Sequence, residues 1–148
     1  MPKKIIIDKI GSPDVLSYVE YDLPKTPTKD HVRIKNKSIG LNYIDTYFRR
    51  GIYPTPTPFP ICPGMEAAGE IIGVGENVKD FVLGDRVCYA APPLGAYSEI
   101  RDFPADKAFE IPDYISNDEG ASILLKGMTV EYLFNRTYKV KTNEKVLF

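Results

Sequence analysis

Short apolar runs, each ended by Gly, Pro, Asn or Asp, fill the first hundred residues of this chain and restrict its fold more than any other feature. They predict β-strands at residues 3–10, 17–21, 32–38, 67–74, 86–90 and 97–100. Many short strands at close spacing favour a partly open β-barrel over alternating βαβ units. We therefore predict a mainly β fold with short helices.

Two helical segments interrupt the strands. The first is predicted at residues 43–50. The second opens at residues 116–119, whose sequence Ser-Asn-Asp-Glu has the form of a capping box, and continues over 121–138. Gly127 is expected to break or kink this helix. Prolines at every second position of residues 53–60 predict a stiff, extended connector.

Composition narrows the function classes. The 148 residues, 43% apolar and 26% charged, suit one globular domain. A net charge of −1 from 19 basic and 20 acidic residues, well mixed along the chain, gives no reason to expect a nucleic acid or membrane partner. The N-terminus has too few apolar residues for a signal peptide, and no run approaches a membrane span, so a cytoplasmic location is expected.

Cysteine and histidine are too few for metal chemistry. Cys62 and Cys88 lie far apart without a C-x-x-C motif, and His31 is the only histidine. In a reducing cytosol two free thiols are favoured over a disulfide, although a disulfide between them is conceivable. A tetrahedral zinc site needs three or four ligands at workable spacing, so we expect no metal.

An ordered series of motifs gives the chain a family resemblance. Two segments carry most of it, GLNYIDTYFRRG at residues 40–51 and PGMEAAG at residues 63–69. The supporting motifs follow in the same order at Val74-Gly75, Val78, Gly84-Asp85-Arg86-Val87, Leu94-Gly95-Ala96-Tyr97-Ser98, Ala105-Asp106-Lys107 and Leu125-Lys126-Gly127-Met128-Thr129. Together they resemble the zeta-crystallin-like quinone oxidoreductases of the medium-chain dehydrogenase/reductase superfamily, over nearly the whole chain.

The resemblance implies a GroES-like catalytic domain at residues 1–120. Residues 121–148 would then be a connecting helix and, at 145–148, the first strand of a Rossmann domain that the chain lacks. The family's cofactor is NADPH and its substrate a quinone-like small molecule. Most of the cofactor affinity would lie in the Rossmann domain, so the chain alone is expected to be nearly inactive. Residues 73–75 (Gly-Val-Gly) are expected to form an ordinary β-turn rather than a phosphate-binding turn.

Departures from the zinc-dependent relatives agree with the ligand count. Asn42 stands where those enzymes carry a zinc-binding cysteine, and Met65 stands where they have the histidine of Gly-His-Glu. Their lobe of four closely spaced cysteines is also missing. The resemblance therefore implies a zinc-free enzyme.

Without a metal, hydride delivery to a quinone needs hydrogen-bond donors for the developing oxygen charge, and an amide and phenols can supply them. The catalytic residues carried over from the family are Asn42, Tyr47 and Tyr53. The cofactor-binding residues are Asn42, Asp45, Tyr47, Lys126, Thr129 and Tyr132.

Each of these residues also has a structural interpretation. Asn42 and Asp45 can serve as the N-cap and first-turn acid of a helix, and Asp45 can form an i,i+4 pair with Arg49. Tyr47 can belong to the core. Lys126 can lie along a solvated helix edge with its ammonium in water.

Two other functions stay open. The chain can be a non-catalytic remnant or a split-enzyme subunit that acts as a binding or assembly module. The parent enzyme can instead reduce α,β-unsaturated ketones or enoyl thioesters. Whichever holds, an unpaired helix at residues 121–134 would expose apolar side chains, which predicts self-association, or disorder near residues 135–148.

Overall fold

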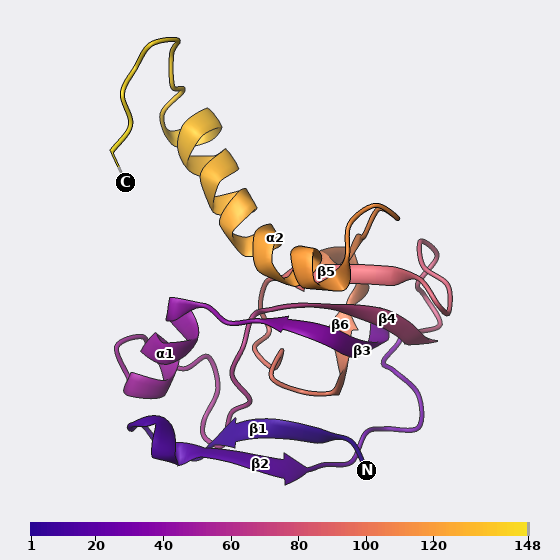
Figure 1. Cartoon of the computed structure of the whole chain (residues 1–148). Helices are drawn as coiled ribbons and strands as arrows, with labels where there is room; N and C mark the ends of the chain where they lie inside the picture. The colour runs from indigo at the N-terminus through magenta and orange to yellow at the C-terminus, as the bar shows by residue number, and fades with distance from the viewer. Residues whose placement is uncertain (148) are drawn as a thin grey trace.

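The computed structural model describes residues 1–147 and arranges the strands in two antiparallel sheets (Figure 1). The smaller sheet pairs β1 (Lys3–Ile7) with β2 (Leu16–Glu20). The larger has the order β6-β3-β4-β5-β7. Its strands are β3 (His31–Gly40), β4 (Glu66–Val74), β5 (Arg86–Ala90), β6 (Ile100–Pro104) and β7 (Phe109–Glu110).

Two isolated bridges, Lys4 to Ser98 and Ile7 to Ile61, link β1 to segments that flank the larger sheet. Both sheets are open at their edges in the described part of the chain. The prediction of a mainly β, partly open fold is therefore confirmed.

One predicted strand is misplaced. The sequence predicts residues 97–100, whereas β6 runs over Ile100–Pro104 and pairs with β3. The amides of Tyr97 and Ser98 donate to the carbonyls of Pro63 and Ala96 instead of to a strand ladder. Pro104 is tolerated because β6 is an edge strand, where one missing N–H breaks no ladder. The two-residue strand β7 was not predicted.

The core lies against the larger sheet and is filled by alternating residues of its strands. Val32 and Ile34 of β3 are fully buried, as is Ile71 of β4. Tyr89 and Phe103 stack with ring centroids 4.3 Å apart and are also fully buried. Such large side chains dominate the stability of a domain of this size, because burial of apolar area is the main favourable term.

The helices begin where the sequence predicts. α1 spans Tyr43–Arg50. α2 spans Asn117–Glu131 and starts with the predicted capping box, in which the Glu119 N–H donates to Ser116 Oγ at 3.2 Å and the Ser116 N–H donates to the Glu119 carboxylate at 2.8 Å. A π-helical turn, η3 (Tyr132–Thr137), follows.

The predicted break at Gly127 is wrong, because α2 continues through it. Figure 1 shows that α2 changes direction between first turns that lie over the larger sheet and later turns that project away from it. Gly120 and Ala121 are the only buried residues of α2. A helix can bend where a foreign group enters its ladder of hydrogen bonds, and the backbone N–H of Leu125 in α2 donates to the carboxylate of Glu66 on β4.

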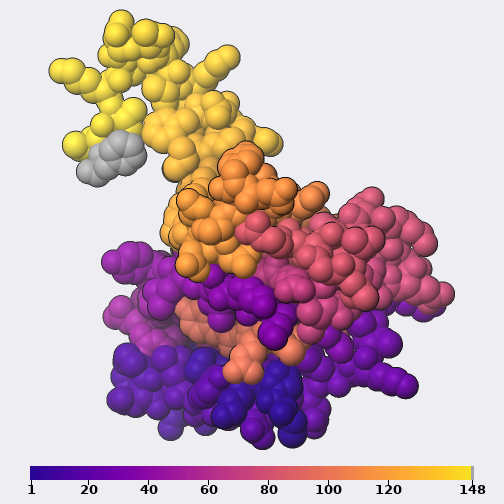
Figure 2. All heavy atoms as spheres, turned by 45° about the vertical axis from the view of Figure 1, so that its right-hand side comes forward, coloured from indigo at the N-terminus to yellow at the C-terminus, as the bar shows by residue number. Residues whose placement is uncertain are grey.

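Residues 126–147, called the projecting segment below, extend from the β body formed by residues 1–125 (Figure 2). Within the projecting segment only Phe134 and Val140 are even half-buried. The strand predicted at residues 145–148 is wrong for 145–147, which form no strand because no other strand pairs with them. Phe148 lies outside the described residues.

Both cysteines are free, as predicted, although Cys62 is half-buried and only Cys88 is fully buried. Burial raises the pKa of Cys62 to about 11, so its thiol is protonated and unreactive at neutral pH. No helix among residues 1–147 has the length and apolar character to cross a bilayer.

Candidate active site

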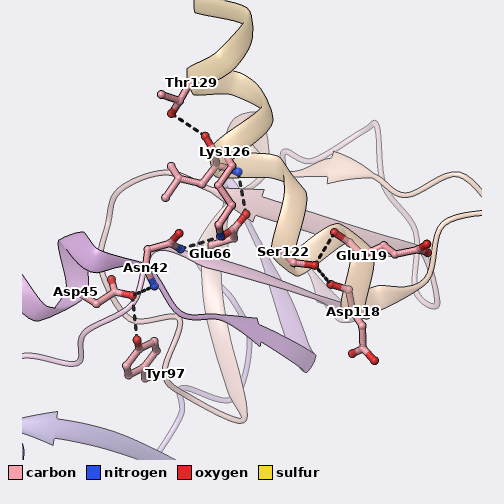
Figure 3. A network of polar contacts seen from close by, with 10 residues as sticks. Asn42, Asp45, Glu66, Tyr97, Asp118, Glu119, Ser122, Lys126 and Thr129 are labelled. Carbon is pink, nitrogen blue, oxygen red and sulfur yellow. Dashed lines mark hydrogen bonds and ion pairs between the residues drawn. The ribbon is translucent and has the colours of Figure 1, made fainter. Parts of the chain in front are cut away.

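A fully buried carboxylate, Glu66 at the start of β4, is the centre of the polar network drawn in Figure 3. Its Oε2 accepts from Asn42 Nδ2 at 2.8 Å and lies 2.9 Å from the ammonium of Lys126. Its Oε1 accepts the backbone N–H of Leu125 at 2.8 Å. A buried charge is tolerated only when it is paired and hydrogen-bonded, and Glu66 has a cation and two further donors.

Asn42 is the N-cap residue of α1 and is itself buried. Its backbone N–H donates to the carboxylate of Asp45 at 3.0 Å, the reciprocal half of a capping box. The structural role predicted for the two residues is thus present. Because the asparagine amide carries two N–H groups and Glu66 uses one, Asn42 keeps a donor for another partner.

Asp45 lies behind Asn42 and is almost completely buried, at 4% exposure. Its Oδ2 also accepts the hydroxyl of Tyr97 at 2.9 Å. Burial raises the pKa of Asp45, while the hydrogen bonds from Asn42 and Tyr97 work in the opposite direction. This carboxyl therefore fixes the start of α1, and Figure 3 shows it on the side of Asn42 that faces away from Lys126.

The ion pair predicted between Asp45 and Arg49 is wrong. Although the residues are one helical turn apart, no ion pair joins them in the described structure, and Asp45 Oδ1 and Arg49 Nη1 are each buried without a hydrogen-bond partner. Tyr97 and the N-cap amide hold the other carboxylate oxygen of Asp45. The local cap and the tertiary contact with Tyr97 thus override the helical pairing that sequence spacing favours.

The two predicted catalytic tyrosines form their own pair. Tyr47 of α1 and Tyr53 contact edge to face, with ring centroids 5.5 Å apart. The chain folds back after the helix, so that the N–H of Tyr53 donates to the carbonyl of Tyr47 at 3.3 Å. Tyr47 is half-buried and Tyr53 is 46% exposed, so neither phenol is sealed in the core.

The predicted cofactor-binding residues of α2 and η3 differ in their exposure and in their hydrogen-bond partners. The Lys126 side chain is 54% exposed even though its ammonium is paired with Glu66. The Thr129 hydroxyl donates to the Leu125 carbonyl of its own helix at 2.8 Å. Tyr132 lies at the end of α2 and is 59% exposed. The structure thus brings Asn42 and Lys126 together on one carboxylate and leaves Thr129 and Tyr132 further along the helix.

The residues available for a cofactor fit only its reactive end. The turn after β4 cannot hold a pyrophosphate, because the N–H of Gly75 donates to His31 O and that of Asn77 to Lys29 O. The turn predicted at residues 73–75 lies later than expected, because Gly73 and Val74 end β4 and the turn is closed by the Val78 N–H donating to the Gly75 carbonyl. Asn42, Lys126 and Tyr132, in contrast, present donors that suit a carboxamide or an oxygen anion.

No group of three or more His, Cys, Asp or Glu side chains within residues 1–147 is arranged to hold a metal ion. The zinc-free character of the site stays a prediction. It rests on Asn42 and Met65 in the positions noted above.

Comparison with known proteins identifies the family. The model of the alcohol dehydrogenase GroES-like domain matches residues 28–113, which is more than half of the chain. The chain belongs to this family. This GroES-like domain is also 45% identical to a quinone oxidoreductase from Pseudomonas aeruginosa over all of its 148 residues, which cover 45% of that relative. It thus spans less than half the length of the curated relatives it matches.

Two further relatives bear on the chemistry. The structure of Escherichia coli quinone oxidoreductase complexed with NADPH superposes with a TM-score of 0.92 and 45% identity, covering 96% of this chain and 43% of that one. A 2-haloacrylate reductase from Burkholderia is 43% identical over 147 residues, covering 96% of this chain and 44% of the relative. The predicted resemblance to the quinone oxidoreductases of the medium-chain superfamily is confirmed.

Glu66 and Tyr97 are the residues of this network that sequence reasoning did not single out. Glu66 follows Met65 directly, at a strand start where a carboxylate would ordinarily be solvated. An acidic residue that opens the apolar run AAGEIIG was the available signal, since buried charges are rare without a specific partner. Tyr97 carries no such signal, because a tyrosine in a loop is compatible with any environment.

Proposed function

We propose that this GroES-like domain forms the substrate side of an NADPH-dependent quinone reductase. The observation that carries the proposal is the placement of the Asn42 amide and the Lys126 ammonium on one buried carboxylate, next to the helix that bears Tyr47. Quinone reduction places negative charge on an oxygen, and preorganised donors stabilise that charge more than solvent does. The NADPH-bound E. coli relative has the same fold over this part.

When bound, NADPH supplies the hydride. The two-electron reduction of a quinone to a hydroquinone also consumes one proton at neutral pH. In this proposal Asn42 and Lys126 donate hydrogen bonds to the oxygen that gains charge. Tyr47 and Tyr53 line the approach and offer phenol protons to the second oxygen. Asp45 acts through Asn42, whose backbone it fixes.

The cofactor contacts proposed for this chain are Asn42, Tyr47, Lys126, Thr129 and Tyr132, with Asp45 acting indirectly because it is buried behind Asn42. We infer that they hold the nicotinamide end, while the phosphates are bound by a nucleotide-binding segment of the kind that the family resemblance implies. The chain by itself should then bind NADPH weakly and turn over slowly. We expect it to act in the cytoplasm and without zinc.

The direct test joins residues 1–148 to the nucleotide-binding half of the E. coli relative and measures NADPH oxidation with a naphthoquinone. The proposal expects quinone-dependent turnover that the unjoined 148-residue chain lacks. A joined protein that binds NADPH but never reduces a quinone would reject the proposed activity. An unjoined chain that binds NADPH at micromolar concentration and turns over would reject the claim that a separate nucleotide-binding segment supplies most of the cofactor affinity.

A second activity is favoured by one specific observation, the 43% identity to a 2-haloacrylate reductase. Reduction of an activated C=C bond also leaves charge on a carbonyl oxygen, so the same donors would serve it. Competition between a naphthoquinone, 2-chloroacrylate, an enone and an enoyl thioester in the joined protein ranks the acceptors by kcat/KM. A larger value for any unsaturated carbonyl compound would replace the quinone assignment.

A non-catalytic role as a remnant or split-enzyme subunit, acting as an assembly module, is the third candidate. It draws on the apolar side chains that the projecting segment exposes. Val130 is 50% exposed and Leu133 49% exposed, and such surfaces favour association. Sedimentation velocity of the 148-residue chain should detect self-association that rises with concentration. A monomer at all concentrations would leave no support for an assembly module built on self-association.

A further inference from the structure

The carboxylate of Glu66 connects its own strand, β4, to both α1 and α2. Its partners are the N-cap side chain of α1 and two consecutive residues of α2. All of these contacts lie between 2.8 and 2.9 Å. The ion pair with Lys126 joins a fully buried carboxylate to a cation whose side chain is 54% exposed. One buried group therefore determines where the donors of the proposed site stand relative to each other.

The contact with Leu125 also affects the path of α2. In an uninterrupted α-helix the Leu125 N–H points at the carbonyl of residue 121, four positions earlier. Here that N–H donates to Glu66 Oε1, and the Ala121 carbonyl lies against Gly40, where an added Cβ would be only 2.2 Å from it. Figure 3 shows α2 changing direction between Ser122 and Lys126, at the level of Glu66. A side chain inserted into the helical ladder is a recognised cause of such a bend.

We propose that Glu66 is a positioning residue for the reaction: its carboxylate sets the bend of α2 at Leu125 and thereby holds Lys126 beside Asn42. The catalytic meaning of this inference rests on the proposed function. Glu66 itself has no exposed atom to offer a substrate, because it is 0% exposed. It acts through the Asn42 amide, the Lys126 ammonium and the direction of the projecting segment that carries Thr129 and Tyr132.

The test uses the 148-residue chain labelled with 15N. Glu66→Gln replaces one acceptor oxygen by a donor, so the amide cannot accept from Asn42, Lys126 and Leu125 together. We expect the Leu125 N–H and the Asn42 side-chain amide signals to move. Residual dipolar couplings should report a changed orientation of residues 126–131 relative to the β body. Glu70→Gln is the matched control, since Glu70 lies on the same strand in a half-exposed pair with Lys37 and should leave these signals unchanged.

A second pair of variants keeps the test decisive if Glu66→Gln fails to fold. Lys126→Met removes the half-exposed cation of the pair but leaves the Asn42 amide and the Leu125 N–H as donors to the Glu66 carboxylate, so some stability is lost while the β body should stay folded. It should shift the Asn42 side-chain amide through their shared oxygen, and Lys126→Arg should restore most of that signal. An Asn42 side-chain amide signal that does not shift in either variant would overturn the inference. So would an unchanged helix orientation in a folded Glu66→Gln chain.

The kinetic arm separates this inference from the proposed function. In the joined protein, Glu66→Gln should lower kcat on the order of 10²-fold, as misplacement of a catalytic group by about 1 Å does, with a smaller change in KM. If the joined protein without any substitution reduces no quinone, the proposed function fails, while the NMR result still decides the positioning role. If turnover exists and Glu66→Gln leaves kcat intact, the positioning role is rejected and the proposed function stands.

Discussion

The β body buries a core of large apolar side chains, whereas the projecting segment exposes most of its own. In the β body, apolar side chains alternate into a core around Tyr89 and Phe103, and even the charged Glu66 is enclosed with matched partners. In the projecting segment, large apolar residues such as Val130 and Tyr132 face outward. The boundary falls within α2, between buried Ala121 and exposed Lys126. The comparison teaches that one continuous helix can belong to the core at one end and expose apolar side chains at the other.

The largest effect should come from the core. Phe103→Ala should lower the free energy of unfolding by about 3–5 kcal/mol, because it removes a stacked aromatic ring and leaves a cavity. Leu133→Ala in the projecting segment should change it by no more than about 0.5 kcal/mol, since Leu133 is 49% exposed. Urea denaturation followed by circular dichroism measures both. Equal losses would contradict the contrast between the two regions.

The next effect lies at the boundary. Gly40→Ala places a methyl group 2.2 Å from the Ala121 carbonyl oxygen and 2.6 Å from Glu66 Oε2, so α2 must move away from β3. The expected loss is about 1–3 kcal/mol, the usual range for overpacking. Because the added group displaces α2, the Leu125 amide signal should shift as well. A variant as stable as the natural chain would show that α2 is only loosely attached here.

Gly127→Ala should do the opposite. An added Cβ there meets only the Ile123 side chain, at 3.7 Å, which is ordinary contact. Alanine is preferred to glycine inside a helix by up to about 1 kcal/mol, so the variant should gain a part of that and raise helicity in circular dichroism. Loss of stability would mean that the glycine is needed for a bend at its own position, which the structure does not show.

The smallest effect is a pH dependence from Asp45. Burial raises its pKa above the unfolded value, so its contribution to stability is full below the unfolded pKa and is lost as pH rises through the folded pKa. Asp45→Asn removes this titration. The stability of the natural chain relative to the variant should therefore fall as pH rises from about 4, the ordinary pKa of an aspartate, upward through the raised folded pKa.

Asp113→Asn, at an exposed position, is the control and should leave the pH profile unchanged. The urea midpoint at each pH is the measurement for both variants. A constant difference between the natural chain and Asp45→Asn across this range would show that Asp45 is not perturbed by burial.

Local signals in the sequence were sufficient for most of the fold. Residues 116–119 predicted the start of α2 because a capping box is satisfied within one turn. The strand over Arg86–Ala90 was also predicted with the correct bounds, because the turn residues Gly84 and Asp85 directly precede it. In contrast, β6 was displaced because the choice between residues 97–100 and Ile100–Pro104 depends on pairing with β3, some seventy residues away.

The site was predicted in part. Asn42 and Lys126 were named, but the carboxylate that joins them was not, because Glu66 is separated from Lys126 by 60 positions and its burial is a tertiary property. A break or kink of α2 was predicted at Gly127 because glycine has a low helix propensity, whereas the contact of the Leu125 N–H with Glu66 lies two residues earlier. Helix propensity depends on the local sequence, whereas such contacts join residues that are far apart in the sequence.

The account depends most on Asn42 as a donor to the reduced substrate, and one kinetic comparison tests it. In the joined protein, Asn42→Ser keeps a residue suited to the N-cap of α1 but removes the amide, whereas Asn77→Ser removes an amide from an exposed turn. We predict that kcat for the quinone falls by roughly 10²-fold or more in Asn42→Ser, the usual cost of losing one such donor, and stays unchanged in Asn77→Ser. Equal kcat values for the two folded variants would contradict the account.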